Sequence, residues 1–163
     1  MEIFGPLLAG FAPVVGPHLW WLIPVVVAVL VLRFPMLGRG PNSSARDPWR
    51  GFKFGARTAV LERAGGRCEG SAFLFWGRCD APAVEIDHVV PWSRGGPTVV
   101  GNGQALCKAH NRSKGASTPA WWYVLGLERR RRSYFPVGAD VRVRAVMSGT
   151  DRMLRERSAA TRA

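Results

Sequence analysis

The chain has 163 residues, a length that allows one folded domain of about 100 residues together with appended segments. Its 23 lysines and arginines against 11 aspartates and glutamates give a net charge of +12, which favours polyanionic partners such as nucleic acid or anionic lipid headgroups. Three cysteines cannot all pair with one another, which argues against an extracellular disulfide framework and favours thiolate ligands in a reducing compartment.

The first part of the chain is apolar. No residue between Ile3 and Leu32 carries a fixed charge, and the strictly apolar run Leu19–Leu32 has 14 residues. About 20 residues are needed to cross the hydrocarbon core, a length that the run reaches if it extends back toward Phe11 or forward to Leu37. The sequence therefore predicts a transmembrane anchor within residues 1–37. A buried helix of a soluble domain and a misassigned start codon are the alternatives.

Basic residues gather on the C-terminal side of this apolar segment, whereas Glu2 is the only charged residue before it. The positive-inside rule then predicts that the N-terminus lies outside and that the remainder lies in the cytoplasm. Residues 38–55 are rich in glycine, proline and serine and are predicted to form a linker. A short helix is expected over Ala56–Ala64, because Gly65 and Gly66 follow it directly.

The middle of the chain alternates strand and turn signals. The β-branched segment Ala83–Val90 predicts a strand, and Gly95-Gly96-Pro97 predicts a turn. We expect Thr98–Val100 to pair back as a second strand and Leu106–Lys114 to form a helix.

Residues 119–163 are predicted to be a basic, aromatic-containing C-terminal extension. It holds Trp121-Trp122-Tyr123, the run Arg129–Arg132 and a predicted strand over Asp140–Ala145. The arginine run could hold either a duplex backbone or an anionic lipid surface, and the sequence does not separate the two.

Three features of the central segment carry chemistry: the pair Asp87-His88, then Asn102, then a cluster with Cys107, His110 and Asn111 among basic residues. From Thr58 to Ala116 this pattern resembles the HNH endonuclease family. The resemblance implies an α+β protein with a small ββα-metal fold, a nuclease domain over residues 56–118 and hydrolysis of DNA phosphodiester bonds with one divalent metal. It implies no small-molecule substrate and says nothing of the oligomeric state.

The cysteines and one histidine form a set suited to structural zinc. Cys107 and His110 are separated by two residues, and Cys68 and Cys79 by ten. Three thiolates and one imidazole are a normal tetrahedral ligand set for Zn²⁺. Many HNH proteins are similar in having two cysteine pairs around the Asp-His strand, although their first pair is usually separated by only two residues. Buried thiols without a metal are the alternative.

The resemblance also implies the roles of the catalytic residues. Asp87 would bind the catalytic metal, His88 would be the general base, and Asn102 would hold the loop and orient the histidine. An unperturbed imidazole pKa near 6.5 suits a base at neutral pH. On a straight strand Asp87 and His88 would point to opposite faces, and the family resolves this by a bend in the strand.

The last position of the motif can be filled by His110 or by Asn111. Cys107 and His110 lie three apart on one helical face, whereas Asn111 is turned by roughly 100°. We therefore assign His110 to zinc and Asn111, with Asp87, to Mg²⁺ or Mn²⁺, which prefer oxygen ligands. With this assignment the chain resembles the HNN-type variant of the family.

Basic side chains around the motif are predicted to contact DNA phosphates, with a solvated helix face as the alternative for each of them. They are Arg94, Lys108, Arg112 and Lys114. The leading hypothesis is thus a membrane-anchored HNH endonuclease with its nuclease domain in the cytoplasm. The alternatives are a non-catalytic zinc-knuckle protein that binds nucleic acid, and a membrane-associated basic protein whose Cys/His cluster is purely structural.

Overall fold

A computed structural model describes residues 20–33, 46–72 and 77–161 of the chain. Its internal contacts distinguish two units, Met1–Phe34 and Pro35–Ala163. In the first unit the described residues form one helix, α2 (Leu22–Arg33), of 12 residues. A helix of this length rises about 18 Å, against about 30 Å for the hydrocarbon core. In the ranges that the structure describes, no helix has both the length and the apolar character needed to cross a membrane.

The prediction of a spanning anchor over residues 1–37 is therefore not supported by the described part of that segment. Its other residues, 1–19 and 34–37, lie outside the described ranges, as do residues 38–45 of the predicted linker.

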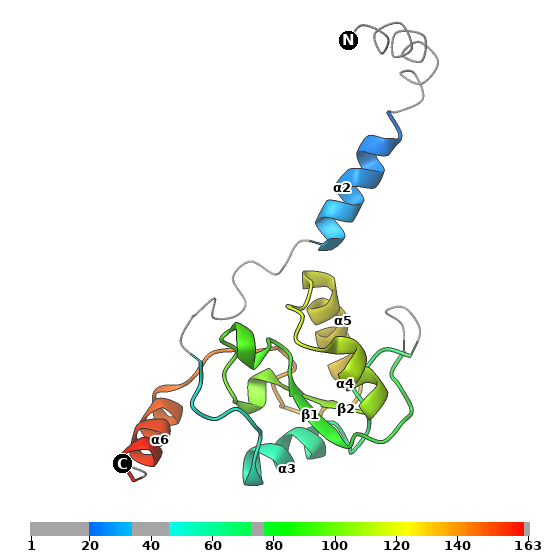
Figure 1. The fold of residues 1–163 in the computed structure, drawn as a ribbon. Helices are drawn as coiled ribbons and strands as arrows, with labels where there is room; N and C mark the ends of the chain where they lie inside the picture. Colours follow the sequence, from blue (N-terminus) through cyan, green and yellow to red (C-terminus); the bar gives the residue numbers. More distant parts are fainter. Residues whose placement is uncertain (1–19, 34–45, 73–76, 162–163) are drawn as a thin grey trace, which may run out of the picture. The chain divides into compact units, whose positions relative to one another are not determined.

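The second unit is built on a two-stranded antiparallel sheet of β1 (Glu85–His88) and β2 (Gly103–Leu106). Asp87 lies opposite Gln104, and His88 lies opposite Gly103. Helix α4 (Lys108–Lys114) follows β2 almost at once and lies against both strands (Figure 1). The order strand, strand, helix, together with the Cys/His cluster, gives the mixed α+β fold expected from the sequence.

The predicted second strand at Thr98–Val100 is wrong. Residues Val100–Asn102 form a 3₁₀ turn, and pairing with β1 begins only at Gly103. The backbone N–H of Thr98 donates to the carboxylate of Asp47 at 2.8 Å, so it is not available to a strand ladder. The helix likewise begins later than expected, because Leu106 is the last residue of β2.

Helix α3 (Phe54–Arg63) agrees with the helix predicted over residues 56–64. It buries Val60 and the following Ala64 against Phe52 and Ala105 of β2. Ile86 of β1 also packs against this apolar cluster, which therefore supports the strand that carries Asp87 and His88.

Helix α5 (Trp121–Arg131) was not expected from the sequence. Its residues Val124 and Leu127 pack with Val89 and Val143 in a second apolar cluster. The predicted strand over 140–145 is wrong, because this segment bends at Arg142 and forms no strand. The N–H of Val143 donates to the side chain of Glu128 at 3.0 Å instead.

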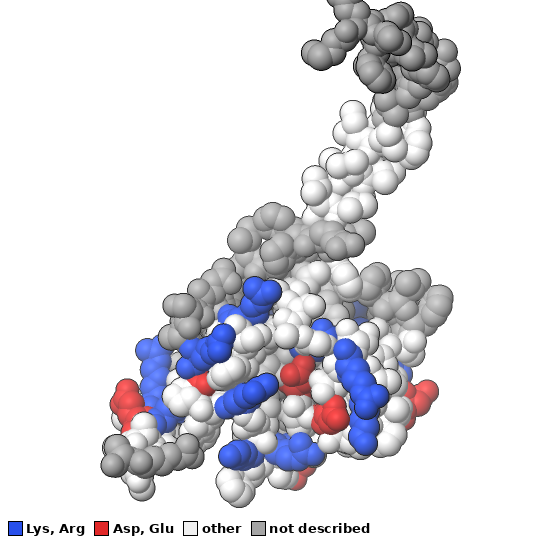
Figure 2. Space-filling model, viewed as in Figure 1, with Lys and Arg blue, Asp and Glu red and all other residues white. Residues whose placement is uncertain are grey.

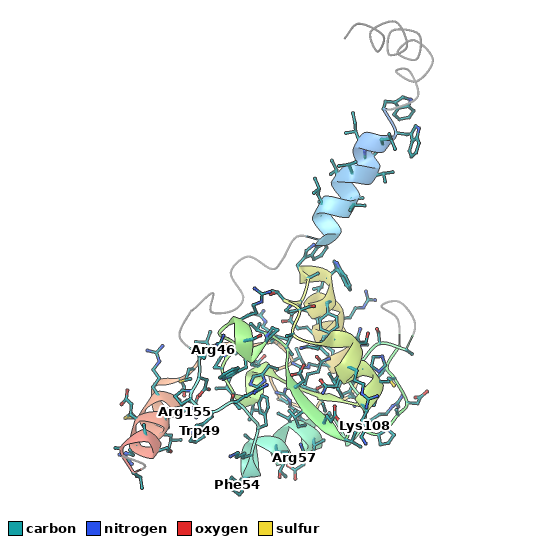
Figure 3. The ribbon with its side chains drawn as sticks, in the orientation of Figure 1. Arg46, Trp49, Phe54, Arg57, Lys108 and Arg155 are labelled. Atoms are coloured by element: carbon teal, nitrogen blue, oxygen red, sulfur yellow. The ribbon has the colours of Figure 1, made fainter. Side chains whose placement is uncertain are left out.

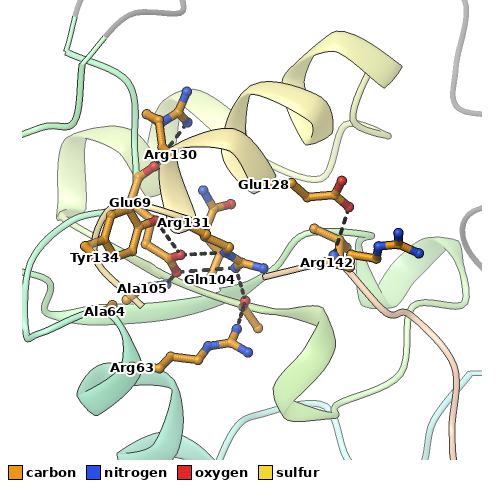
Figure 4. A network of polar contacts seen from close by, with 12 residues as sticks. Arg63, Ala64, Glu69, Gln104, Ala105, Glu128, Arg130, Arg131, Tyr134 and Arg142 are labelled. Carbon is orange, nitrogen blue, oxygen red and sulfur yellow. Dashed lines mark hydrogen bonds and ion pairs between the residues drawn. The ribbon is translucent and has the colours of Figure 1, made fainter. Parts of the chain in front are cut away.

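A buried ion pair joins α5 to the sheet (Figure 4). The guanidinium of Arg131 donates to Glu69 at 2.8 Å, and both side chains have no exposed surface. Glu69 also accepts from the N–H of Ala105 at 2.8 Å and from the hydroxyl of Tyr134 at 2.9 Å. Arg131 therefore cannot contact DNA or lipid, which corrects the reading of Arg129–Arg132 as a single basic surface.

Helix α6 (Gly149–Ala160) begins at Ser148, whose hydroxyl accepts from the N–H of Asp151 at 3.1 Å. The Asp151 carboxylate accepts from the N–H of Ser148 in return, completing a capping box that defines the start of the helix. Arg155 is the one buried residue of α6. The C-terminal extension thus continues the second unit rather than leaving it.

Candidate metal centre and active-site cleft

Four potential metal ligands come together beside the sheet. The ligand atoms of Cys68, Cys79, Cys107 and His110 all lie within 4.8 Å of one another. Cys68 and Cys79 are brought together next to β2 by backbone bonds: the N–H of Cys79 donates to Gly70 O at 2.9 Å, and the N–H of Glu69 donates to Ala105 O at 2.8 Å. The structure thus closes the enlarged loop between the two cysteines, and the donor set fits tetrahedral Zn²⁺.

The ring of His110 is oriented for ligation through Nδ1. Its Nε2 lies 3.1 Å from the carbonyl oxygen of Ser71, which can only accept, so Nε2 carries the proton. Nδ1 then faces the sulfur atoms, at 3.3 Å from Cys107 and 3.5 Å from Cys68. A carbonyl that fixes the tautomer of a histidine ligand is a common feature of zinc sites.

The environments of the thiols differ. Burial raises the pKa of Cys68 to about 11, whereas the backbone N–H of His110 lowers the pKa of Cys107 to about 7. Because zinc binds the thiolate, the charge of a bound cation would offset the effect of burial and favour ionisation of Cys68.

Gly70 allows the histidine to approach. A Cβ atom at position 70 would lie 2.5 Å from the ring carbon Cγ of His110, which no packed structure tolerates. The backbone N–H of Gly70 also points at Cys68 Sγ, at 3.3 Å. The sequence offered no signal for this residue.

A separate cleft of about 360 Å³ brings together three predicted catalytic residues, Asp87, His88 and Asn111. Asn111 is turned away from the cysteines, as the helical geometry predicted, while His110 lies among them. The motif is therefore divided in space into a thiol-rich cluster and an oxygen-rich cleft.

His88 is 5 % exposed, and its ring packs 4.6 Å from that of Phe52. Its Nε2 lies 2.9 Å from the hydroxyl of Thr98, and this hydroxyl donates to the carbonyl oxygen of Trp49. Thr98 must then accept from His88, so Nε2 carries the proton and Nδ1 keeps a free lone pair. Burial lowers the pKa of His88 to about 4, against the opposing charge of Asp87, so the ring is neutral at neutral pH.

The two oxygen ligands of the cleft each have a partner. Asp87 accepts from the ammonium group of Lys114 at 2.6 Å. Asn111 donates through Nδ2 to Glu85 at 2.5 Å, which leaves its Oδ1 as the atom able to bind a cation. The Asp87 side chain is 27 % exposed, so it can be reached from the solvent. This donor set fits a hard divalent ion such as Mg²⁺ or Mn²⁺.

Asn102 is fully buried and holds the loop between the two strands. Its Oδ1 accepts from Val90 N at 2.9 Å, and its Nδ2 donates to Val90 O at 3.0 Å and Pro97 O at 2.9 Å. Its bond to Pro97 fixes the residue directly before Thr98, whose hydroxyl is the hydrogen-bond partner of His88. It acts on the histidine through the loop rather than by direct contact.

The predicted DNA contacts separate into two kinds. Arg94, Lys108 and Arg112 are exposed, as a phosphate contact requires. Lys114 has a side chain that is only 8 % exposed and is paired with Asp87, so its ammonium group is already bound to a carboxylate of the cleft.

Several residues of the cleft were not singled out from the sequence. Arg50 and Trp92 line it, and the guanidinium of Arg50 lies 5.4 Å from the centre of the Trp92 ring. Asp47 and Arg155 lie behind it, on the side of Thr98. For the residues of the segment assigned to the linker, Trp49 and the neighbouring phenylalanines were the available signal, because a solvated linker rarely needs large aromatic side chains.

Comparison with known families agrees with this geometry. Residues 75–117 match the family model described as HNH endonuclease, a range that includes the whole Asp87–Asn111 motif but not Cys68. Neither the curated proteins nor the solved structures contain a match to the chain. The resemblance of the motif to the HNH endonuclease family is thereby confirmed over residues 75–117.

Proposed function

We propose that the second unit is a metal-dependent endonuclease that hydrolyses phosphodiester bonds of DNA. The observation that carries the proposal is the cleft itself, where Asp87, His88 and Asn111 meet although 23 positions separate His88 from Asn111. A protein that only binds nucleic acid has no chemical need for a neutral imidazole beside two oxygen ligands.

His88 is proposed as the general base. Its Nδ1 would accept a proton from the water whose oxygen bonds to phosphorus, while the bond from phosphorus to the sugar oxygen breaks. Asp87 and Asn111 Oδ1 would hold Mg²⁺ or Mn²⁺, which supplies positive charge for the scissile phosphate and the leaving oxygen. Asn102 keeps the loop of Thr98 in place.

The Cys68, Cys79, Cys107 and His110 cluster is proposed to hold structural Zn²⁺. A two-stranded sheet with a seven-residue helix buries little apolar surface by itself, and a bound metal adds folding free energy directly. The cluster fixes the start of α4 through Cys107 and His110, and α4 in turn carries Asn111.

Charge distribution supports a nucleic-acid substrate. Lysines and arginines are spread over the face that Figure 2 shows, with fewer acidic groups between them. Arg94, Lys108 and Arg112 are the exposed basic side chains nearest to the motif in sequence, and they are proposed as phosphate contacts. Arg50, which lines the cleft, is added to them.

The test is cleavage of supercoiled plasmid by the full chain with Mg²⁺, with Mn²⁺ and with EDTA, beside the variant His88→Ala. The wild-type chain is expected to cleave the plasmid with either metal. The cleavage rate is expected to fall by about 10²- to 10⁴-fold in His88→Ala. His18→Ala, the same change outside the described residues, is the matched control and should cut normally.

Binding of plasmid without cleavage under either metal would support the non-catalytic alternative instead. Cleavage that His88→Ala leaves intact would point to a contaminating nuclease and refute the assignment of the base.

The membrane location is proposed from the sequence alone. Membrane fractionation of cells that produce the full chain, compared with a chain starting at Arg46, tests it, and equal recovery of both in the soluble fraction would contradict it.

A further inference from the structure

We propose that Asp47 and Arg155 form a clamp that positions His88 as the base of the cleft. These two residues are called the Asp47–Arg155 clamp below. The inference rests on the proposed nuclease function for its catalytic consequence, but its contacts belong to the fold itself. Neither residue lies in the segment that matches the family model.

The first step is the group that holds the imidazole. His88 Nε2 is bonded to the hydroxyl of Thr98 at 2.9 Å, and that hydroxyl donates to the carbonyl oxygen of Trp49. The direction of the His88 ring therefore depends on the positions of two loop residues, neither of which belongs to a strand or helix.

Asp47 holds both of these residues. Its Oδ1 accepts from the N–H of Trp49 at 2.9 Å, and its Oδ2 accepts from the N–H of Thr98 at 2.8 Å. Asp47 is 4 % exposed, so the two bonds are shielded from water. One carboxylate thus sets the distance between the carbonyl and the hydroxyl that hold His88.

Arg155 completes the arrangement from α6. Its guanidinium faces both oxygens of Asp47, at 3.3 and 3.4 Å, and donates to the carbonyl oxygen of Thr98 at 2.8 Å. It also lies 3.9 Å from the centre of the Trp49 ring, beside which Figure 3 shows it. Arg155 therefore contacts all three residues behind the histidine.

The way in which α6 is attached supports a role beyond packing. A helix docked for stability alone buries an apolar stripe, but α6 leaves Met153 and Leu154 exposed and buries Arg155. Burying a guanidinium is costly unless its partners are aligned, so the ion pair determines where the helix lies. The helix is thus placed by the same contacts that place Thr98.

The test compares Asp47→Asn and Arg155→Gln with the full wild-type chain in plasmid cleavage. In Asp47→Asn the new amide group must face one of the two N–H donors, so one bond is lost without a change of shape. Because a displacement of about 1 Å can cost a hundredfold in rate, kcat is expected to fall about 10- to 100-fold, with KM within about twofold. Arg155→Lys, which keeps the charge but not the fork, should recover part of the loss.

Arg152→Gln is the matched control, because it removes the same charge from an exposed position of α6. It should leave kcat unchanged. In a His88→Ala background, Arg155→Gln should lower the residual rate by less than about twofold, because the clamp acts through the histidine.

Nitrogen NMR of the His88 ring provides a readout independent of activity. The wild-type ring is expected to show the Nε2–H tautomer, and Asp47→Asn a mixture of both tautomers. An unchanged tautomer in Asp47→Asn, or a rise in KM with unchanged kcat in Arg155→Gln, would overturn the clamp. A wild-type chain that cuts no DNA would remove the proposed nuclease function, while the ring signals would still decide whether the clamp holds His88.

Discussion

The buried arginine of α5 allows a sharp test of how the second unit is held together. In Arg131→Met the side chain keeps an unbranched apolar stem but loses the guanidinium group and its charge. Arg131 donates to Glu69 at 2.8 Å and to the carbonyl of Gly103 at 2.8 Å, and neither member of the ion pair is exposed. Removing one member of such a pair typically costs about 3–5 kcal/mol.

The remaining partners place the expected cost near the lower end of that range. Glu69 keeps the bonds from Ala105 N and Tyr134 Oη, and the carbonyl of Gly103 keeps a bond from Arg63 at 2.6 Å. We therefore expect the free energy of unfolding to fall by about 3 kcal/mol in Arg131→Met. For a domain of this size, that corresponds to a decrease in Tm of about 10 °C.

Urea and thermal unfolding of the full chain, followed by circular dichroism, measure the effect. Arg132→Met, at an exposed neighbouring position, is the control and should change stability by less than about 0.5 kcal/mol. The double variant Glu69→Gln with Arg131→Met removes both charges and should be more stable than Arg131→Met alone. Equal stabilities of Arg131→Met and Arg132→Met, with equal losses of DNA affinity, would refute the reasoning. They would show that Arg131 and Arg132 both belong to an exposed basic surface that contacts DNA.

Three further predictions concern the metal sites. Gly70→Ala should lower the zinc content measured by atomic emission, because the new methyl group would lie 2.5 Å from the His110 ring. Gly55→Ala is the control and should keep its zinc, because no atom lies within 4 Å of the new methyl group. Equal zinc contents of the two variants would contradict the close packing of Gly70 against His110. Lys114→Met should decrease the Mg²⁺ concentration for half-maximal cleavage by about fivefold, since about 1 kcal/mol of repulsion near Asp87 is removed, and an increase would show that Lys114 assists the metal. Asn111→Ala should abolish cleavage with zinc retained, whereas His110→Ala should lose zinc, and unchanged zinc in the latter would refute the division of the motif.

Residues that act over short distances along the chain were predictable from the sequence. The helix near α3 follows from a polar–apolar pattern that ends at two glycines, and the Cys107–His110 spacing placed both side chains on one helical face. The same geometry separated Asn111 from the cluster. The family pattern brought Asp87 and His88 to one site.

Contacts between distant segments were not predictable. Asp47 and Arg155 are separated by 108 positions, and neither residue type indicates its partner. The start of β2 was missed because the N–H of Thr98 is bonded to Asp47, and the strand over 140–145 was missed because Val143 is bonded to Glu128. In each case a backbone N–H donates to a side-chain carboxylate, whereas β-propensity alone would predict that it donates to a neighbouring strand.

The separation of the two halves of the clamp has a consequence for protein synthesis. Arg155 follows Thr98 by 57 positions, which a ribosome adds in about 3 to 11 s. During that interval the nascent chain already contains Asp87 and His88, and it gains Asn111, but it lacks the guanidinium that binds the carbonyl of Thr98. A growing polypeptide therefore carries the reactive groups for several seconds before the contacts around its histidine can be complete.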